Sequence, residues 1–165
     1  MKVVSDSSPL IALARIDCLI GLHRLYGSIL IPAEVHSEVV LSGEGMPGAS
    51  EVERAPWIEV HAPLDAEDLA KSMRQTGLGA GEVSAVLVAH ETAADLLLID
   101  KRRTRRHANI QGLEVIGCIG ILETMHRRGH LDDLHEAYAR LIEAGFRIEK
   151  RALSESLARL NLSPL

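Results

Sequence analysis

The stretch "KVVSDSSPLIALARI", residues 2–16, contains the first change of structure along the chain. The β-branched run at its start predicts a short strand, and that run stops at the carboxylate of Asp6. Two serines and Pro9 follow, which favours a helix with Ser7 or Ser8 as its N-cap. Two interpretations of Asp6 are therefore open: it is part of a helix cap, or it is the first ligand of a metal site.

Short strands alternate with longer helices along the rest of the chain. Further strands are predicted at residues 28–31, 57–60, 95–99 and 114–117. Helices are predicted at residues 8–27, 32–41, 65–75, 80–93, 101–112 and 118–129, and two more lie in residues 131–160 on either side of Gly145, whereas residues 41–56 and 74–82 are predicted loops. The alternation predicts an α/β fold with a mostly parallel central sheet covered on both faces.

The overall composition narrows the class of protein. The 165 residues predict a single domain, residues 1–165, and the net charge of −5 excludes a protein that coats nucleic acid by bulk charge. Aromatic residues make up only 2%, so stacking of bases on aromatic side chains is not expected. No signal peptide is apparent, and no stretch reaches the roughly 20 apolar residues of a membrane span. We therefore expect a soluble, cytoplasmic protein that does not interact with membranes.

Four acidic residues fall where a parallel sheet collects its ligands. Asp6 and Asp100 each end a predicted strand, and both should lie at the carboxyl edge of the sheet. Glu38 can reach this edge from the helix after the second strand, and Glu82 from the helix after "GLGAG". Each acid alone has a structural explanation, such as capping a helix or opposing its dipole. Together they form a set of hard oxygen ligands that suits Mg²⁺ or Mn²⁺ and phosphodiester hydrolysis.

A basic run, "KRRTRRH" at residues 101–107, begins at the same edge directly after Asp100. It can be a solvated helix face, or its guanidinium groups can hold phosphates by paired hydrogen bonds. The histidines of "MHRRGHLDDLH", residues 125–135, match no compact zinc motif. The chain also lacks the phosphate-binding loop of an NTPase.

Five segments in order resemble the PIN-domain family: "VVSDSSPLIALARI", "ILIPAEVHSEVV", "GLGAGEVSAVLVA", "ADLLLIDKRRTRRHA" and "GLEVIGCIGILETMHRRG". They cover most of residues 1–129, the core that resembles the family, and leave residues 130–165 as a helical extension. The resemblance implies a three-layer α/β/α fold and cleavage of single-stranded RNA with Mg²⁺ or Mn²⁺. It also extends, more distantly, to the toxin ribonucleases of toxin–antitoxin pairs, so it implies an antitoxin protein or a second copy of the chain as partners.

The resemblance also assigns roles to individual residues. Asp6, Glu38, Glu82 and Asp100 would be the catalytic, metal-binding acids, and Ser7 or Ser8 would support them. Arg102, Arg103 and Arg106 are our candidates for binding RNA phosphates. The chain departs from the toxin nucleases in two ways: Glu82 stands where aspartate is more common, and the segment after Asp100 is more basic. The second departure fits stronger substrate binding, or the alternative of a catalytically weak or inactive module that binds nucleic acid or a partner.

Overall fold

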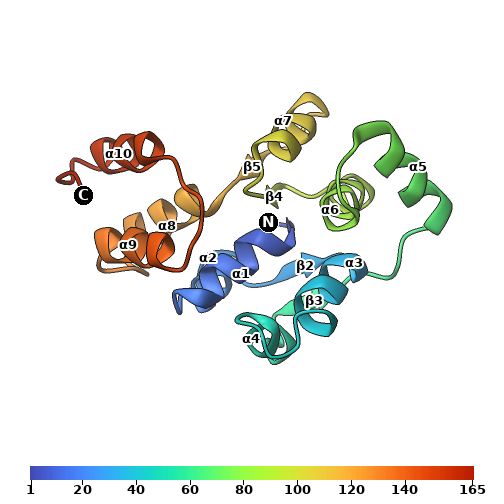
Figure 1. Ribbon diagram of the computed structural model, residues 1–165, viewed down its shortest axis with the longest axis horizontal. Coiled ribbons are helices and arrows are strands. Elements are labelled where there is room, and N and C mark those ends of the chain that lie inside the picture. The colour runs from blue at the N-terminus through green and yellow to red at the C-terminus, as the bar shows by residue number, and fades with distance from the viewer.

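The computed structural model describes residues 1–165 and has a five-stranded sheet at its centre (Figure 1). The strands are ordered β3-β2-β1-β4-β5, and every pairing between neighbours is parallel. They span Val3–Ser5 (β1), Ile29–Ile31 (β2), Ile58–Val60 (β3), Leu96–Leu98 (β4) and Val115–Ile116 (β5). All five predicted strands are present, and the first of them is the central one.

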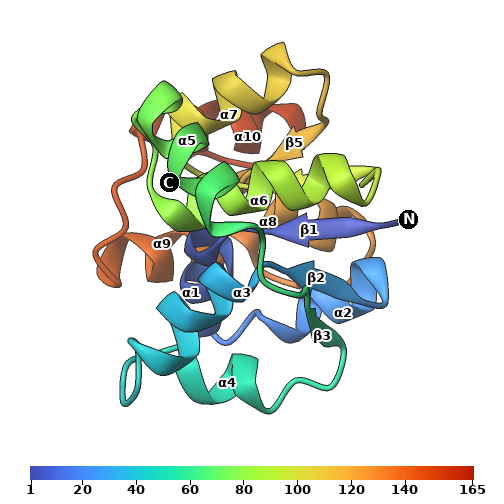
Figure 2. The same ribbon diagram turned by 90° about the vertical axis from the view of Figure 1, so that its right-hand side faces the viewer.

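Helices cover both faces of the sheet (Figures 1 and 2). They span Ser7–Arg15 (α1), Ile20–Tyr26 (α2), Ala33–His36 (α3), Ala49–Glu53 (α4), Ala66–Thr76 (α5), Ala80–Glu91 (α6), Arg102–Ile110 (α7), Cys118–Arg127 (α8), Leu134–Glu143 (α9) and Lys150–Arg159 (α10), and a π-helix, η1, spans Ser37–Leu41. Helices α6 and α7 pack on one face, and the larger core on the other face includes residues of α1, α2, α8, α9 and α10. This is the predicted three-layer α/β/α architecture. No helix combines the length and the hydrophobicity that a membrane-spanning segment needs.

The two cores follow from the alternation of side chains along each strand. Val3 and Leu98 belong to the larger core, whereas their neighbours Val4 and Leu97 belong to the smaller one. Successive residues of a strand point to opposite faces of the sheet, so a strand covered on both sides needs apolar residues at successive positions. Val3 and Val4 of β1 and the three leucines of β4 are explained in this way, and the buried Ser5 that ends β1 donates its hydroxyl to the carbonyl of Asp6 at 2.8 Å.

The start of the first helix differs from the prediction. Helix α1 begins at Ser7 and its N-cap is Asp6, not Ser7 or Ser8. The backbone of Asp6 is still extended, and no side chain donates or accepts a capping hydrogen bond there. The predicted helix at residues 8–27 is divided in two at Asp17, which has a φ of 57°.

Two further predictions are corrected in detail. Residues 41–56 were expected to form only a loop, but they include the end of η1 and the short helix α4, which buries Val52. The spacing of Leu134, Tyr138, Leu141 and Ile142 in the sequence predicts one apolar helix face, but Ile142 is 48% exposed. Leu134, Tyr138 and Leu141 do form that buried face, because they recur at helical spacing.

The C-terminal helices are part of the main core. Tyr138 of α9 is fully buried, and its hydroxyl shares a hydrogen bond with Ser156 of α10. Arg159 of α10 donates to the buried carboxylate of Glu123 of α8 at 2.5 Å. Because a buried carboxylate needs a partner, this ion pair fixes α10 against α8.

The packing of α10 leads to a stability prediction. We expect Leu157→Ala to lower the free energy of unfolding by about 2–5 kcal/mol, since Leu157 is only 1% exposed and truncation leaves a cavity. Urea unfolding followed by circular dichroism should show one transition at a lower midpoint. Ile142→Ala, on the exposed side of α9, is the control and should cost less than about 1 kcal/mol. A separate early transition, or no loss in Leu157→Ala, would contradict the shared core.

Candidate functional site

The centre of the carboxyl edge of the sheet, where β1 and β4 end, is the place at which the chain connections diverge. Strand β1 continues into α1 on the face of the larger core, and β4 continues into α7 on the opposite face. In parallel α/β sheets, ligands bind in the crevice that forms at such a point. Asp6 follows β1 directly, and its backbone N–H donates to the carbonyl of Leu98 at 3.0 Å. The sheet thus fixes Asp6 at the point where the connections diverge.

Asp6 is a buried carboxylate with an unused oxygen. It is 1% exposed, and its Oδ2 has no hydrogen-bond partner. Its Oδ1 accepts a long hydrogen bond of 3.4 Å from the hydroxyl of Ser7. Burial raises the pKa of Asp6 to about 6, and the charges of Glu38 and Glu82 contribute in the same direction. The backbone of Ser7 and the ammonium of Lys101 lower that pKa but do not offset the burial.

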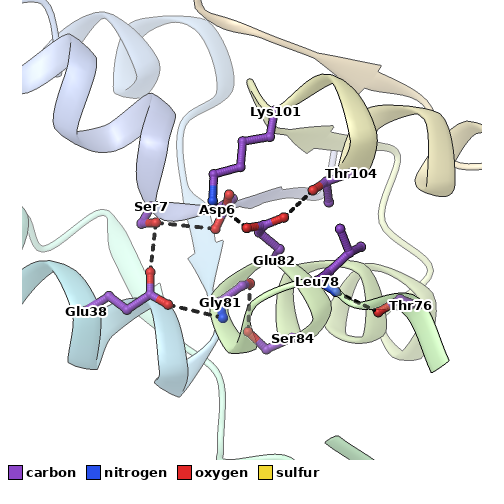
Figure 3. Close-up of polar contacts among 10 residues, drawn as sticks. All are labelled: Asp6, Ser7, Glu38, Thr76, Leu78, Gly81, Glu82, Ser84, Lys101 and Thr104. Atoms are coloured by element: carbon purple, nitrogen blue, oxygen red, sulfur yellow. Dashed lines mark hydrogen bonds and ion pairs between the residues drawn. The ribbon is translucent and has the colours of Figure 1, made fainter. Parts of the chain in front are cut away.

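Glu38 reaches the same place from η1. Its Oε2 accepts a hydrogen bond from Ser7 Oγ at 2.9 Å, and its Oε1 accepts from the backbone N–H of Gly81 at 3.2 Å (Figure 3). Gly81 lies in the first turn of α6, so the carboxylate of Glu38 lies at the positive end of that helix. A Cβ at Gly81 would lie 2.5 Å from Glu38 Oε1, so only glycine permits this approach. Single π-turns are common at functional sites, and this one places Glu38 in its first turn.

Glu82 is held by two groups that follow β4. Its Oε1 accepts from Lys101 Nζ at 2.5 Å, and its Oε2 accepts from the hydroxyl of Thr104, which is fully buried (Figure 3). The hydrogen bond to Glu82 raises the pKa of Lys101, and the charges of Asp6 and Glu38 raise it further. Asp6, Glu38 and Glu82 are here named the acidic cluster; Glu82 contacts the ammonium of Lys101, and Asp6 and Glu38 act on it through their charges.

Asp100 lies at the same edge, but its side chain serves another element. Its Oδ1 accepts from the backbone N–H of Cys118 at 2.7 Å, and its Oδ2 accepts from Cys118 Sγ at 3.0 Å. Asp100 thus binds the N-terminus of α8, where a carboxylate opposes the helix dipole. Burial raises the pKa of the Cys118 thiol well above its usual value, and Asp100 raises it further. A Cβ at Gly117 would lie 2.9 Å from Asp100 Oδ1, which explains the glycine.

The structure distinguishes among the supporting residues left open by the sequence. Ser7 bridges Asp6 and Glu38, whereas Ser8 makes no such contact. The candidate phosphate ligands Arg102, Arg103 and Arg106 are exposed on α7, and Arg103 donates to the carbonyl of Thr76 at 2.8 Å. Their role in RNA binding stays a prediction.

The acids gather at one edge of the sheet, but as they are positioned they do not form a complete metal site. No three His, Cys, Asp or Glu side chains are arranged so that they could hold a metal ion as they stand. Glu82 is directed to Lys101 and Thr104, and Asp100 is directed to Cys118. The role of the four acids as joint metal ligands therefore also stays a prediction.

The sequence placed the basic run that starts at Lys101 at this edge but did not predict that Lys101 contacts the acids, and it gave no role to Thr104, Gly81 or Cys118. Lys101 is the next residue after Asp100, so the strand-end rule that selected Asp100 could have selected it as well, whereas Thr104 lies within α7. Nothing in the sequence marks Cys118 as the partner of Asp100, because that contact depends on how α8 approaches the sheet.

The raised pKa of Asp6 makes stability depend on pH. Between about pH 4 and pH 6 the folded protein keeps a proton that the unfolded chain has lost, so its free energy of unfolding falls as the pH rises through this range. We expect Asp6→Asn, in buffer with a metal chelator, to be more stable than wild type by about 1–3 kcal/mol at pH 7.5. The gain should vanish near pH 4.

Urea unfolding of both proteins at the two pH values measures this difference. Asp132→Asn, at an exposed position, is the matched control and should change stability little at either pH. Equal stability of wild type and Asp6→Asn at pH 7.5 would contradict the buried charge.

Comparison with known proteins gives the family. A model of the PIN domain family matches residues 2–162. The fold is similar to the crystal structure of PAE2754 from Pyrobaculum aerophilum, with a TM-score of 0.53 and 16% identity over 78% of this chain and 96% of that one. It is also similar to SSO1118, a PilT N-terminus domain protein from Sulfolobus solfataricus P2, with a TM-score of 0.52 and 22% identity over 82% of this chain and 98% of that one. No curated protein sequence matches the chain. Since the family match spans nearly its whole length, this chain belongs to the PIN domain family.

Proposed function

We propose that the chain is a metal-dependent endoribonuclease that cleaves single-stranded RNA at the acidic cluster. The observation that carries the proposal is Asp6, which is buried and has a carboxylate oxygen without a partner next to two further acids. A buried charge of this kind is costly unless a ligand or partner compensates it. PIN domains are generally nucleases and typically use divalent metal ions, so membership of the family supports the same chemistry.

The residues at the edge fit a divalent cation. Asp6, Glu38 and Glu82 offer only carboxylate oxygens, which are the ligands preferred by Mg²⁺ and Mn²⁺. The cluster already attracts one cation, since the ammonium of Lys101 lies 2.5 Å from Glu82. These three acids would hold the ion, and Asp100 could join them only by releasing the N-terminus of α8. A bound ion would supply activation of water and neutralise charge on the leaving oxygen.

The surrounding residues position the acids. The hydroxyl of Ser7 has one proton, and the shorter contact, at 2.9 Å, gives it to Glu38, while Asp6 lies at 3.4 Å; Ser7 therefore holds Glu38 beside Asp6. Thr104 fixes one oxygen of Glu82 from a fully buried position. Rigid placement of this kind reduces the reorganisation that a reaction requires.

Substrate binding is assigned to the start of α7. Arg102 and Arg106 are exposed there, and neither forms an ion pair within the chain. Guanidinium groups bind phosphate oxygens through paired hydrogen bonds, so these two residues can hold the RNA backbone beside the acids. The choice of single-stranded RNA follows from the resemblance to the toxin ribonucleases.

Cleavage of end-labelled single-stranded RNA in the presence of Mn²⁺ tests the proposal. Wild type should cut the RNA internally, and Asp6→Asn should lower the rate by at least about 100-fold, because it removes a charged ligand of the cation. Asp132→Asn should cut like wild type, and a chelator should stop all cleavage. Parallel arms with single-stranded DNA and duplex RNA define the substrate.

Two results would contradict the ribonuclease. Cleavage by Asp6→Asn at the wild-type rate would exclude the acidic cluster as the catalytic site. RNA that binds with a steep salt dependence but stays intact with every divalent ion would instead identify a module that only binds nucleic acid.

The proposal extends to a toxin role controlled by an antitoxin. Controlled expression of wild type in a bacterial host should stop growth, and Asp6→Asn at the same protein level should not, because the toxicity would require RNA cleavage. Growth curves with immunoblots measure both quantities. Normal growth of both strains would contradict a toxin role. Growth arrest in both strains would show that the toxicity does not depend on Asp6.

A further inference from the structure

Lys101 points into the acidic cluster, although more than half of its side chain is exposed to solvent. Its side chain is 59% exposed, yet its Nζ is directed at Glu82 and lies beside Asp6 (Figure 3). No other basic side chain of the protein forms an ion pair with Asp6, Glu38 or Glu82. The chain therefore supplies its own cation to the place where the proposed function needs a metal ion.

The charges of this group limit what else can bind. The three ionised carboxylates of the acidic cluster and one ammonium leave two negative charges, which one divalent ion neutralises; Asp100, whose two oxygens accept hydrogen bonds from Cys118, is outside this count. A second divalent ion would leave the group with excess positive charge, next to a residue as deeply buried as Asp6. Cations a few ångströms apart repel each other appreciably even at the partly exposed surface where Lys101 lies, because the effective dielectric constant there is well below that of bulk water.

We propose that Lys101 is an internal counterion that restricts the site to one divalent ion and weakens the binding of that ion. This inference rests on the proposed function, because it concerns the same acids. Lys101 is a positioning and affinity-determining residue rather than a metal ligand. It forms an ion pair with Glu82 that an incoming ion must compete with, and its charge repels that ion from Asp6 and Glu38.

The alternative is that Lys101 only holds Glu82 in place. The structure separates the two roles, because Thr104 binds the other oxygen of Glu82 and remains in a Lys101 variant. Loss of a purely structural contact would leave metal binding unchanged or weaker. Loss of a competing charge would make it tighter.

Titration of chelator-treated proteins with Mn²⁺, followed by electron paramagnetic resonance of the free ion, tests the proposal without any substrate. Wild type should bind one Mn²⁺ per chain. Lys101→Met, which removes the charge and keeps most of the stem, should bind Mn²⁺ at least about tenfold more tightly. Lys101→Arg keeps the charge and should resemble wild type. Lys150→Met, at the start of α10, changes the net charge equally away from the cluster and should also resemble wild type.

Each possible result of the titration either supports or overturns the inference about Lys101. Equal or weaker binding by Lys101→Met, or two Mn²⁺ ions in wild type, would overturn the inference and leave the proposed metal site intact. Absence of binding in both proteins would overturn the metal part of the proposed function together with the inference. Binding of Mn²⁺ by Lys101→Met but not by wild type would support the inference, because the charge of Lys101 would then prevent binding entirely. Circular dichroism verifies folding, and Lys101→Gln replaces Lys101→Met if that variant does not fold.

Discussion

The carboxylate of Asp6 is buried at the end of the central strand, and one of its oxygens has no hydrogen-bond partner. Proteins rarely keep a buried charge in this state, because desolvation without compensation is costly. The surroundings of Asp6 only partly reduce the cost: Ser7 gives a long hydrogen bond and Lys101 a nearby positive charge, while two other acids increase it. If stability alone determined the residue at this position, we would expect an apolar or neutral side chain. The position of Asp6 therefore supports the proposed ion-binding role, and the other acids of the cluster lie next to it.

A structural role and a functional role of the acids are compatible. Parallel strands end where the following helices begin, so their carboxyl edge collects the positive ends of helices. Glu38 accepts from the start of α6 and Asp100 from the start of α8, so both acids stabilise a helix. The glycines at 81 and 117 allow these contacts, since a Cβ at either position would collide with the carboxylate. The same geometry that stabilises single carboxylates also concentrates negative charge in one crevice.

The sequence pattern was sufficient to predict the layers and the positions of the acids along the chain. The short apolar runs that precede Asp6 and Asp100 define the two central strands and their carboxyl ends. The pattern could not predict where the side chains turn. Asp100 binds α8 and Lys101 turns toward the acids, and both choices depend on contacts between segments far apart in the sequence. The basic run after β4 appeared uniform, yet Lys101 enters the acidic cluster while Arg102 and Arg106 remain exposed.

The proposed chemistry requires a divalent ion to bind at Asp6 rather than elsewhere on this acidic protein. The most direct measurement is a crystal structure of the protein soaked with Mn²⁺, with anomalous data collected at the manganese edge. We expect one anomalous peak within coordination distance of Asp6 Oδ2, bordered by Glu38 and Glu82, with Lys101 moved away from Glu82. A peak that lies only at Asp100, or an occupied site in which Asp6 is not a ligand, would contradict the account.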